Sequence, residues 1–217
     1  MIITAVRHLT PVRFDKGVSD VDKPLSESCD IEGAKLLRNV ADARREGYKP
    51  HGSIPAYRYG FTSPYVRCRQ TAKQIQSVAF EWGESTLLRE SAHPGQEVLL
   101  THKKLVTVES AFDLRDRVMR FLDFVHSFDG GSVIAVTHGD VLNAFRWCLE
   151  GLSLSEFRDL FRDKTNFIPF GCALTWDNGR STMTKSTLDE GVLDPIAIHP
   201  VASEWAYSAI PTNFDKD

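Results

Sequence analysis

Two histidines of this 217-residue chain each follow a short run of apolar and β-branched residues: His8 follows residues 2–7, and His138 follows residues 132–137. Arg67 comes shortly after a third stretch of this kind, residues 57–62. In an open α/β sheet, ligands bind at the carboxyl ends of the strands. Neutral imidazole is a nucleophile near pH 7 because its unperturbed pKa is about 6.5, and guanidinium groups offer planar paired donors to phosphate. We therefore expect one electropositive pocket that binds phosphate beside a histidine nucleophile.

Arginines and helix starts stand beside both histidines. Arg7 adjoins His8, and because neighbours in a strand point to opposite faces, the two side chains reach one ligand only where the strand ends. Arg67 falls in the first turn of a helix that Ser63-Pro64 is expected to begin, and His138-Gly139 precedes another helix. Free backbone N–H groups and the positive dipole end at these helix starts favour an anion.

The elements that must position these residues alternate between strand-like and helix-like segments, which predicts βα units on a parallel sheet. The expected strands are residues 2–7, 57–62 and 132–137, with a short one at 87–90; the expected helices are 31–45, 65–80, 112–128 and 141–149; and a hairpin turns at Asn178-Gly179 within 172–183. The predicted fold class is therefore α/β, a three-layer α/β/α sandwich with a central, mostly parallel sheet.

Composition excludes several classes of protein. The chain is 42% hydrophobic with a formal net charge of −3 and no basic or acidic block, so we expect no nucleic-acid partner. No apolar run approaches the roughly eighteen residues of a membrane span, and the apolar N-terminus is too short for a signal peptide. The histidines lack metal-binding spacings, so we expect no metal site. Scattered cysteines, interpreted as reduced thiols, indicate a cytoplasmic protein; they are Cys29, Cys68, Cys148 and Cys172.

Several short motifs stand in order across about residues 2–147. They are Arg7-His8, Asp22-x-Pro24-Leu25-Ser26, Ser63-Pro64-x-x-Arg67-x-x-Gln70-Thr71-Ala72, Leu88-x-Glu90, Arg117-Val118 and Val136-Thr137-His138-Gly139. In kind and order they resemble the motifs of the histidine phosphatase superfamily, also called phosphoglycerate mutase-like. The Ser-Pro-x-x-Arg-x-x-Gln-Thr-Ala string and the final His-Gly are the most specific. We expect one such domain over residues 1–217, with a short cap region at about 84–111.

The resemblance implies a two-step phosphoryl transfer without cofactor or metal. His8 would attack phosphorus in line to give a phosphohistidine, which water would then hydrolyse. Arg7, Arg67 and His138 would hold the phosphoryl oxygens and so stabilise developing charge. Glu90 would protonate the leaving oxygen and then deprotonate the attacking water.

Other residues near the motifs have less specific roles. Asp140 is the rival proton donor, although its position favours the N-cap of the following helix. Ser63 also suits a helix cap, with phosphate contact secondary. Gly139 and Thr10 are further candidates for contacting the substrate, and Arg13 is a candidate for reaching a distal substrate anion.

Two departures from the family pattern leave alternatives open. The family usually has glycine where Leu9 stands, and an acidic residue or glutamine where Thr10 stands. A mutase needs a lid that keeps its phosphohistidine dry, and the stretch between Glu90 and the helix at 112–128 is short for one, so a phosphatase is favoured over a phosphomutase. Leu9 favours a third interpretation, a regulatory module that binds phosphate without turnover. The sequence leaves open the oligomeric state, the role of segment 190–217, and whether the substrate is a small phosphorylated metabolite or a phosphorylated protein side chain.

Overall fold

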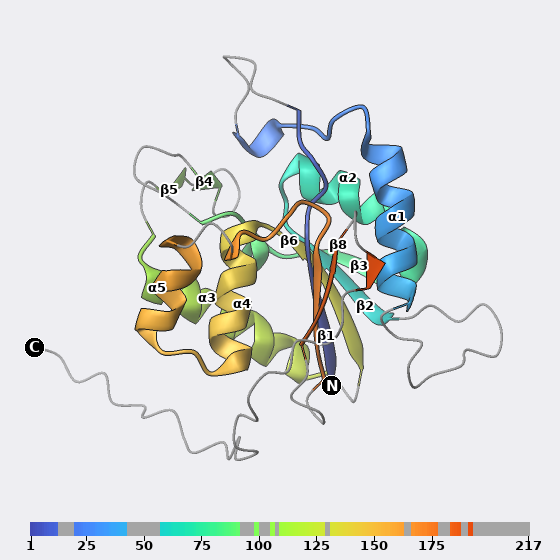
Figure 1. Ribbon diagram of the computed structural model, residues 1–217. Helices are drawn as coiled ribbons and strands as arrows, with labels where there is room; N and C mark the ends of the chain where they lie inside the picture. The colour runs from blue at the N-terminus through green and yellow to red at the C-terminus, as the bar shows by residue number, and fades with distance from the viewer. Residues whose placement is uncertain are drawn as a thin grey trace, which may run out of the picture.

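A computed structural model describes residues 1–12, 20–42, 57–91, 98–99, 105–106, 109–128, 131–162, 166–177, 183–187 and 191–192 (Figure 1). The strands are β1 (Ile2–Arg7), β2 (Tyr57–Thr62), β3 (Ala79–Glu84), β4 (Val98–Leu99), β5 (Leu105–Val106), β6 (Ser132–Thr137), β7 (Ala173–Asp177), β8 (Met183–Thr187) and β9 (Gly191–Val192). The helices are α1 (Cys29–Asp42), α2 (Val66–Gln74), α3 (Ala111–His126), α4 (Gly139–Glu150) and α5 (Leu154–Arg162), with 3-10 turns η1 (Asp20–Asp22), η2 (Gln76–Val78) and η3 (Thr86–Leu88).

The main sheet has the strand order β3-β2-β6-β1-β7-β8-β9, and its first four strands are parallel. β7, β8 and β9 extend it with antiparallel pairs beyond β1. Arg7 of β1 pairs with Thr137 of β6, and Thr62 of β2 pairs with Val136. The carboxyl ends of β1, β2 and β6 therefore meet at one end of the sheet.

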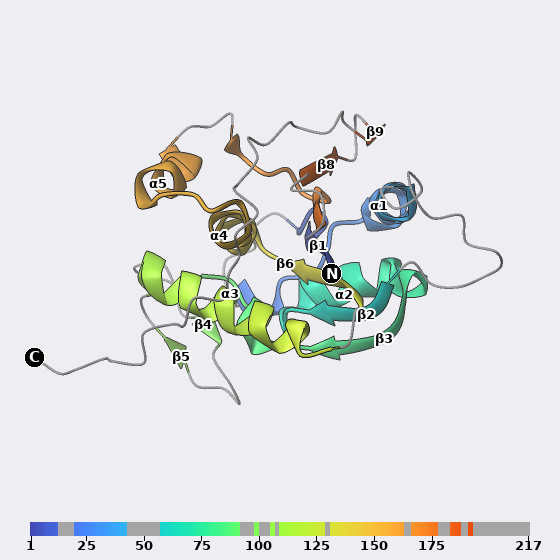
Figure 2. The same cartoon turned by 90° about the horizontal axis from the view of Figure 1, so that it is seen from below.

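Side chains of the central strands divide between two cores, because successive residues of a strand point to opposite faces. Ile3 and Ala5 of β1 join the core that includes α3 and α4, whereas Val6 joins the core that includes α1 and α2. Val133 and Ile134 of β6 divide in the same way. Figures 1 and 2 show α3 and α4 on one face of the sheet and α1 and α2 on the other, which confirms the predicted three-layer sandwich.

The prediction of a helix over residues 65–80 is wrong in its second half. α2 ends at Gln74, and the chain then forms β3, which pairs in parallel with β2. Gly60 of β2 suits this pairing, because a Cβ atom there would come within 2.4 Å of the Trp82 ring on β3. Pairing with a neighbouring strand therefore outweighs the local helical pattern of this segment.

The other expected elements are present with shifted ends, apart from the short strand at 87–90. That prediction is wrong, because η3 covers its first half and the second half has no regular structure. The hairpin strands pair as predicted. Helix α5 was not expected, although its start carries a capping box. The Ser153 N–H donates to Glu156 Oε2 at 2.7 Å, and the Glu156 N–H donates to Ser153 Oγ at 3.3 Å.

Three further observations bear on the sequence expectations. A second sheet pairs β4 with β5 inside segment 84–111. In the described part of the chain, no helix has the length and apolar character needed to cross a membrane. All four cysteines are described, and none of them forms a disulfide.

Candidate active site

The predicted site residues follow the carboxyl ends of the parallel strands and therefore lie close together. His8 follows β1, Ser63 follows β2 and His138 follows β6, while Glu90 follows β3 by way of η3. Arg67 enters from the first turn of α2. The side chains of His8, Arg67, Glu90 and His138 then contact one another.

The backbone around His8 is fixed on both sides. The His8 N–H donates to the Thr137 carbonyl at 3.0 Å, and the His8 carbonyl accepts from the Gly171 N–H at 3.2 Å. Gly171 has a φ of 68°, in the left-handed region that favours glycine. Leu9 is fully buried in the core beneath α1 and α2, and its N–H donates to Thr71 Oγ1 at 3.0 Å. The bulk that replaces the usual glycine is therefore accommodated by the core.

The His8 ring is a neutral imidazole with its lone pair on Nε2. Nδ1 lies 2.7 Å from the Leu9 carbonyl, which only accepts, so Nδ1 carries the hydrogen. Nε2 accepts a hydrogen bond from Arg67 Nε at 3.1 Å. Burial, together with His138 and Arg67, holds the pKa of His8 well below its usual value. The ring is thus nucleophilic at neutral pH.

Arg67 is the centre of the cluster. Its Nη2 atom lies 3.1 Å from Glu90 Oε2 and 3.3 Å from His138 Nδ1. The same atom lies 3.0 Å from Asp20 Oδ2, and Nη1 donates to the Asp20 carbonyl. Burial acts to lower the pKa of Arg67, but the carboxylates of Asp20 and Glu90 outweigh it and raise that pKa, so the guanidinium stays charged.

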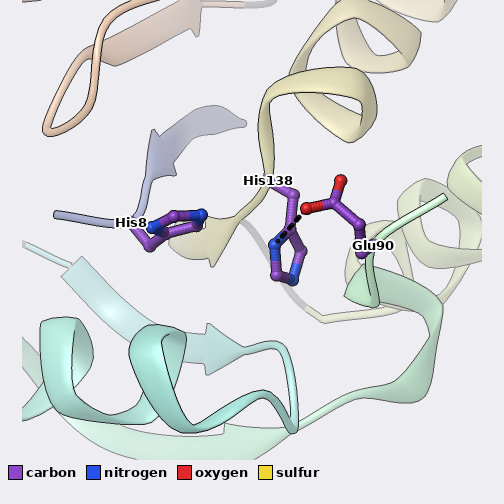
Figure 3. A group of neighbouring side chains, drawn as sticks. All are labelled: His8, Glu90 and His138. Atoms are coloured by element: carbon purple, nitrogen blue, oxygen red, sulfur yellow. Dashed lines mark ion pairs between the residues drawn. The ribbon is translucent and has the colours of Figure 1, made fainter. Parts of the chain in front are cut away.

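His138 lies between a carboxylate and a hydroxyl. Its Nδ1 is 2.9 Å from Glu90 Oε2, and its Nε2 is 2.9 Å from Ser63 Oγ. Because the carboxylate only accepts, Nδ1 carries the hydrogen, and Nε2 accepts from the serine hydroxyl. Burial lowers the pKa of His138, so this ring is neutral as well. Figure 3 shows its ring beside that of His8, with ring centroids 5.3 Å apart.

Glu90 is ionised in this arrangement. Burial acts to raise its pKa, but His138 and Arg67 outweigh burial and hold the pKa far below the ordinary range of a glutamate. The carboxylate is therefore a ready proton acceptor, and it becomes a proton donor only after a proton reaches it.

The segment that carries Glu90 is anchored by buried ion pairs. Arg117 donates to the carbonyls of Leu87 at 2.7 Å and Arg89 at 2.9 Å. Arg117 also pairs with both carboxylate oxygens of Glu109, at 2.8 and 2.7 Å, and Arg89 contacts Glu109 at 3.0 Å. These contacts fix the backbone of residues 87–89, which directly precede Glu90.

Arg7 lies between aromatic rings at the edge of the cluster. Its guanidinium carbon is 4.1 Å from the centroid of the Phe170 ring and 4.7 Å from that of Phe167, and Nη1 donates to the Ile168 carbonyl. A Cβ atom on Gly139 would lie 3.3 Å from this guanidinium carbon. Arg7 Nε is buried without a hydrogen-bond partner in the described structure, so it is a donor available to a bound anion.

Ser63 and Asp140 do not cap helices, contrary to the sequence expectation. α2 begins at Val66, with Tyr65 at the N-cap, and the N-cap of α4 is His138. Ser63 lies before the start of α2, where its Oγ accepts from the Tyr65 N–H at 3.4 Å and donates to His138 Nε2 at 2.9 Å. Asp140 lies one position inside α4, where it accepts a hydrogen bond from Ser91 Oγ at 2.5 Å.

Thr10, a further substrate-contact candidate, is held by backbone hydrogen bonds. The Thr10 N–H donates to Glu32 Oε2 at 3.0 Å, and the Thr10 carbonyl accepts from the Ser26 N–H at 2.9 Å. The backbone of Thr10 is thus tied to the start of α1. Arg13 falls outside the described residues.

His8, Glu90 and His138 also form a group whose donor atoms, within 4.8 Å of one another, could ligate a metal ion. Arg67 already places a positive charge against all three, through its contacts to His8, Glu90 and His138. A metal ion would have to displace that guanidinium, because two cations would otherwise repel at close range. The arrangement therefore fits an anion better than a cation.

Sequence reasoning missed three residues of the site. Tyr65 places its ring 4.7 Å from the His138 ring and 4.7 Å from the Arg67 guanidinium, and Phe170 places its ring 5.3 Å from that of His8. Asp20 binds Arg67. Tyr65 lies inside the Ser-Pro-x-x-Arg motif, which is a usable signal, whereas Asp20 and Phe170 stand in stretches without periodicity.

Comparisons with known proteins bear on the fold and on one part of the chain. The model of the histidine phosphatase superfamily (branch 1) matches residues 96–186, which include His138 and Gly139. No curated protein matches the chain in sequence.

Solved structures share the fold at low identity. The alpha-ribazole phosphatase from Shigella flexneri has a TM-score of 0.61 and 14% identity, covering 89% of this chain and 98% of that chain. A mycobacterial glucosyl-3-phosphoglycerate phosphatase, solved with inorganic phosphate, has a TM-score of 0.59 and 16% identity, covering 90% and 95%. A provisionally assigned phosphohistidine phosphatase SixA from Agrobacterium tumefaciens has a TM-score of 0.51 and 15% identity, covering 90% and 97%. The chain is therefore similar to the histidine phosphatase superfamily in sequence over residues 96–186, and to these phosphatases in fold over most of its length.

Proposed function

We propose that this protein is a phosphatase that hydrolyses phosphomonoesters through a phosphohistidine on His8. The observation that carries the proposal is the 3.1 Å contact between His8 Nε2 and Arg67 Nε. It sets the lone pair of a neutral imidazole beside a guanidinium. These are the nucleophile and the charge-stabilising group that in-line attack on a phosphoryl group requires.

In the first step, His8 Nε2 forms a bond to phosphorus while the bond between phosphorus and the ester oxygen breaks. Arg67 and Arg7 neutralise the phosphoryl oxygens, and the unpartnered Nε of Arg7 is one of the donors. The Nδ1–H of His138 and the backbone N–H groups of the first turn of α4, beginning at Gly139, stabilise the same charge. Ser63 holds the His138 ring in place.

The leaving oxygen needs a proton, and Glu90 is the side chain placed to supply it. Glu90 is ionised while His138 and Arg67 hold its pKa low. A phosphate monoester keeps one proton below its second pKa of about 6, and it delivers this proton to Glu90 on binding. The phosphoryl oxygens also draw Arg67 away from Glu90, which raises the pKa of that carboxyl. In the second step water attacks phosphorus, Glu90 takes the proton of that water, and the bond to His8 breaks.

The fold fits a phosphatase and a mutase alike, and we favour the phosphatase. The proposed cap, segment 84–111, begins at the end of β3 and ends at the start of α3. It is short for a lid that excludes water from the phosphohistidine, so hydrolysis is the expected fate of the intermediate.

We propose a small phosphorylated metabolite or a phosphorylated protein side chain as the substrate. Structures of the same fold are named for alpha-ribazole, glucosyl-3-phosphoglycerate and phosphohistidine phosphatases, which supports both classes. A screen of phosphorylated metabolites and phosphopeptides, scored by kcat/KM, would identify the substrate. No metal or cofactor takes part in the proposed reaction, and a cytoplasmic location suits cysteines that form no disulfide.

The test is hydrolysis of p-nitrophenyl phosphate in the presence of a metal chelator by the wild type, by His8→Ala and by the control His126→Ala. His126 lies at the end of α3, where its Nδ1 is 2.7 Å from the Leu122 carbonyl. We expect His8→Ala to lose at least about a thousandfold in kcat, because the nucleophile is gone. His126→Ala should match the wild type. Equal, near-zero rates for wild type and His8→Ala would instead support the binding module without turnover.

A further inference from the structure

Every nitrogen of the Arg67 guanidinium is engaged in this structure. Nε donates to His8, Nη1 donates to the Asp20 carbonyl, and Nη2 contacts the carboxylates of Asp20 and Glu90. A phosphoryl group within bonding reach of His8 Nε2 needs donors from this same guanidinium. At least one of the present acceptors must therefore yield when the substrate binds.

Asp20 is the acceptor that can yield most easily. The segment before Glu90 is held by Arg117 through two backbone carbonyls, and the Glu90 side chain is 19% exposed. The Asp20 side chain is 35% exposed and belongs to η1, a three-residue turn without buried residues. Its side chain can rotate toward solvent while that of Glu90 is confined.

Lys23 gives the Asp20 carboxylate a second partner. Its Nζ lies 2.7 Å from Asp20 Oδ1, while Asp20 Oδ2 lies 3.0 Å from Arg67 Nη2. Burial acts to raise the pKa of Asp20, but Lys23 and Arg67 outweigh it and lower that pKa, so the group is a carboxylate at neutral pH. One anion thus bridges two cations beside the nucleophile. When Asp20 releases Arg67, its charge can stay paired with Lys23.

We propose that Asp20 is an affinity-determining residue, an internal anion that competes with the phosphoryl group for Arg67. The inference rests on the proposed function, since it assumes that Arg67 binds phosphate. While Asp20 holds Arg67, the site is closed to phosphate. The apparent affinity is then the intrinsic affinity reduced by the fraction of molecules in which Arg67 is released. The same competition weakens binding of the phosphate product and hastens its release.

The experiment is calorimetric titration with inorganic phosphate of the wild type, Asp20→Asn and the control Asp22→Asn. Asparagine keeps the shape of Asp20 and the backbone contact to Nη1 and removes only the charge. Asp22 is an exposed carboxylate of the same turn, so its variant controls for the loss of one negative charge. We expect Asp20→Asn to bind phosphate about fivefold more tightly, the upper end of the effect of a partly exposed ion pair, and Asp22→Asn to match the wild type. For p-nitrophenyl phosphate, KM should fall in Asp20→Asn while kcat changes by less than about twofold.

The outcomes separate this inference from the proposed function. Hydrolysis by the wild type together with equal or weaker phosphate binding by Asp20→Asn would overturn the competitor role and leave the phosphatase intact. Binding by none of the three proteins would contradict both proposals, because release of Arg67 should expose a phosphate site. Thermal unfolding of each variant establishes that the titrated proteins are folded.

Discussion

Arg67 Nε donates a hydrogen bond to His8 Nε2 at 3.1 Å. A residue in the first turn of α2 thus fixes the lone pair of the histidine that follows β1. On the other side of the ring, the Leu9 carbonyl accepts from Nδ1 at 2.7 Å. Together the two contacts select one tautomer and one orientation of the imidazole. Preorganisation of this kind is what lowers the barrier to charge development in an enclosed site.

The buried His8 ring gives a testable pH dependence. Burial, His138 and Arg67 lower its pKa from 6.5, so the ring keeps its lone pair as the pH falls through that value. The acid limb of kcat/KM for p-nitrophenyl phosphate should therefore have its midpoint well below pH 6.5. On the alkaline side, activity toward esters with poor leaving groups should decline above about pH 6 as the substrate loses the proton that loads Glu90, whereas p-nitrophenyl phosphate should be affected far less. An acid limb centred at or above pH 6.5 would show that the nucleophile is not the buried neutral ring.

Replacement of Glu90 by Gln tests the proton donor. Glutamine cannot supply a proton, so esters with poor leaving groups should lose about a hundredfold or more in kcat, whereas p-nitrophenyl phosphate should lose far less. The measurement is kcat against the pKa of the leaving alcohol. Asp140→Asn is the matched control, because Asp140 is the rival donor and accepts a hydrogen bond from Ser91. A uniform loss in Glu90→Gln, with a steep leaving-group dependence in Asp140→Asn, would transfer the role to Asp140.

Gly139→Ala tests the position of Arg7. The added Cβ atom would lie 3.3 Å from the guanidinium carbon of Arg7, which Phe170 and Phe167 confine from other sides. A shift of a few tenths of an ångström should cost about tenfold in kcat/KM, since small misplacements of a charge-stabilising group are costly. The control is Gly83→Ala, whose Cβ atom would meet the Phe61 ring at an ordinary 3.5 Å. Full activity in Gly139→Ala would mean that catalysis does not depend on the present position of the Arg7 guanidinium.

Glu109→Gln tests the ion pairs that anchor the Glu90 segment. Glu109 is almost fully buried between Arg117 and Arg89, and the loss of one partner of a buried pair leaves an uncompensated charge. The free energy of unfolding should fall by about 3–5 kcal/mol in urea titrations. The exposed pair of Arg69 and Glu84, with 3.7 Å between its charged atoms, provides the control, and Glu84→Gln should cost under about 1 kcal/mol. Similar losses of unfolding free energy in both variants would show that the buried ion pairs stabilise the protein no more than an exposed pair does.

The local sequence predicts the site residues that directly follow strands. A β-branched run that ends in His8 or His138 marks both a buried strand and its carboxyl end, and parallel pairing then brings such ends together. Ser63-Pro64 predicts a helix near Arg67 but places its first residue too early, and the Ser63 hydroxyl instead donates to His138 Nε2 across the sheet. A long-range hydrogen bond of this kind leaves no local mark.

Other features depend on contacts between distant segments. β3 forms because β2 offers it an edge to pair with, against the helical pattern of its residues. Asp20 and Phe170 reach Arg67 and His8 from loops whose path is set by the whole fold. The protonation state of Glu90 also depends on several distant residues, since burial raises its pKa while His138 and Arg67 lower it.

The most direct test is to trap the phosphoenzyme with a phosphorus-labelled substrate and locate the label by peptide mapping. We predict a phosphate on His8 that is labile in acid and stable in base, and its absence from His8→Ala. Ser63 and Cys68, whose side-chain atoms lie 2.9 and 3.4 Å from His138 Nε2, are two rival nucleophiles. Burial raises the pKa of the Cys68 thiol, which keeps it from forming the reactive thiolate. Label on serine or cysteine, stable in acid or retained in His8→Ala, would contradict the mechanism.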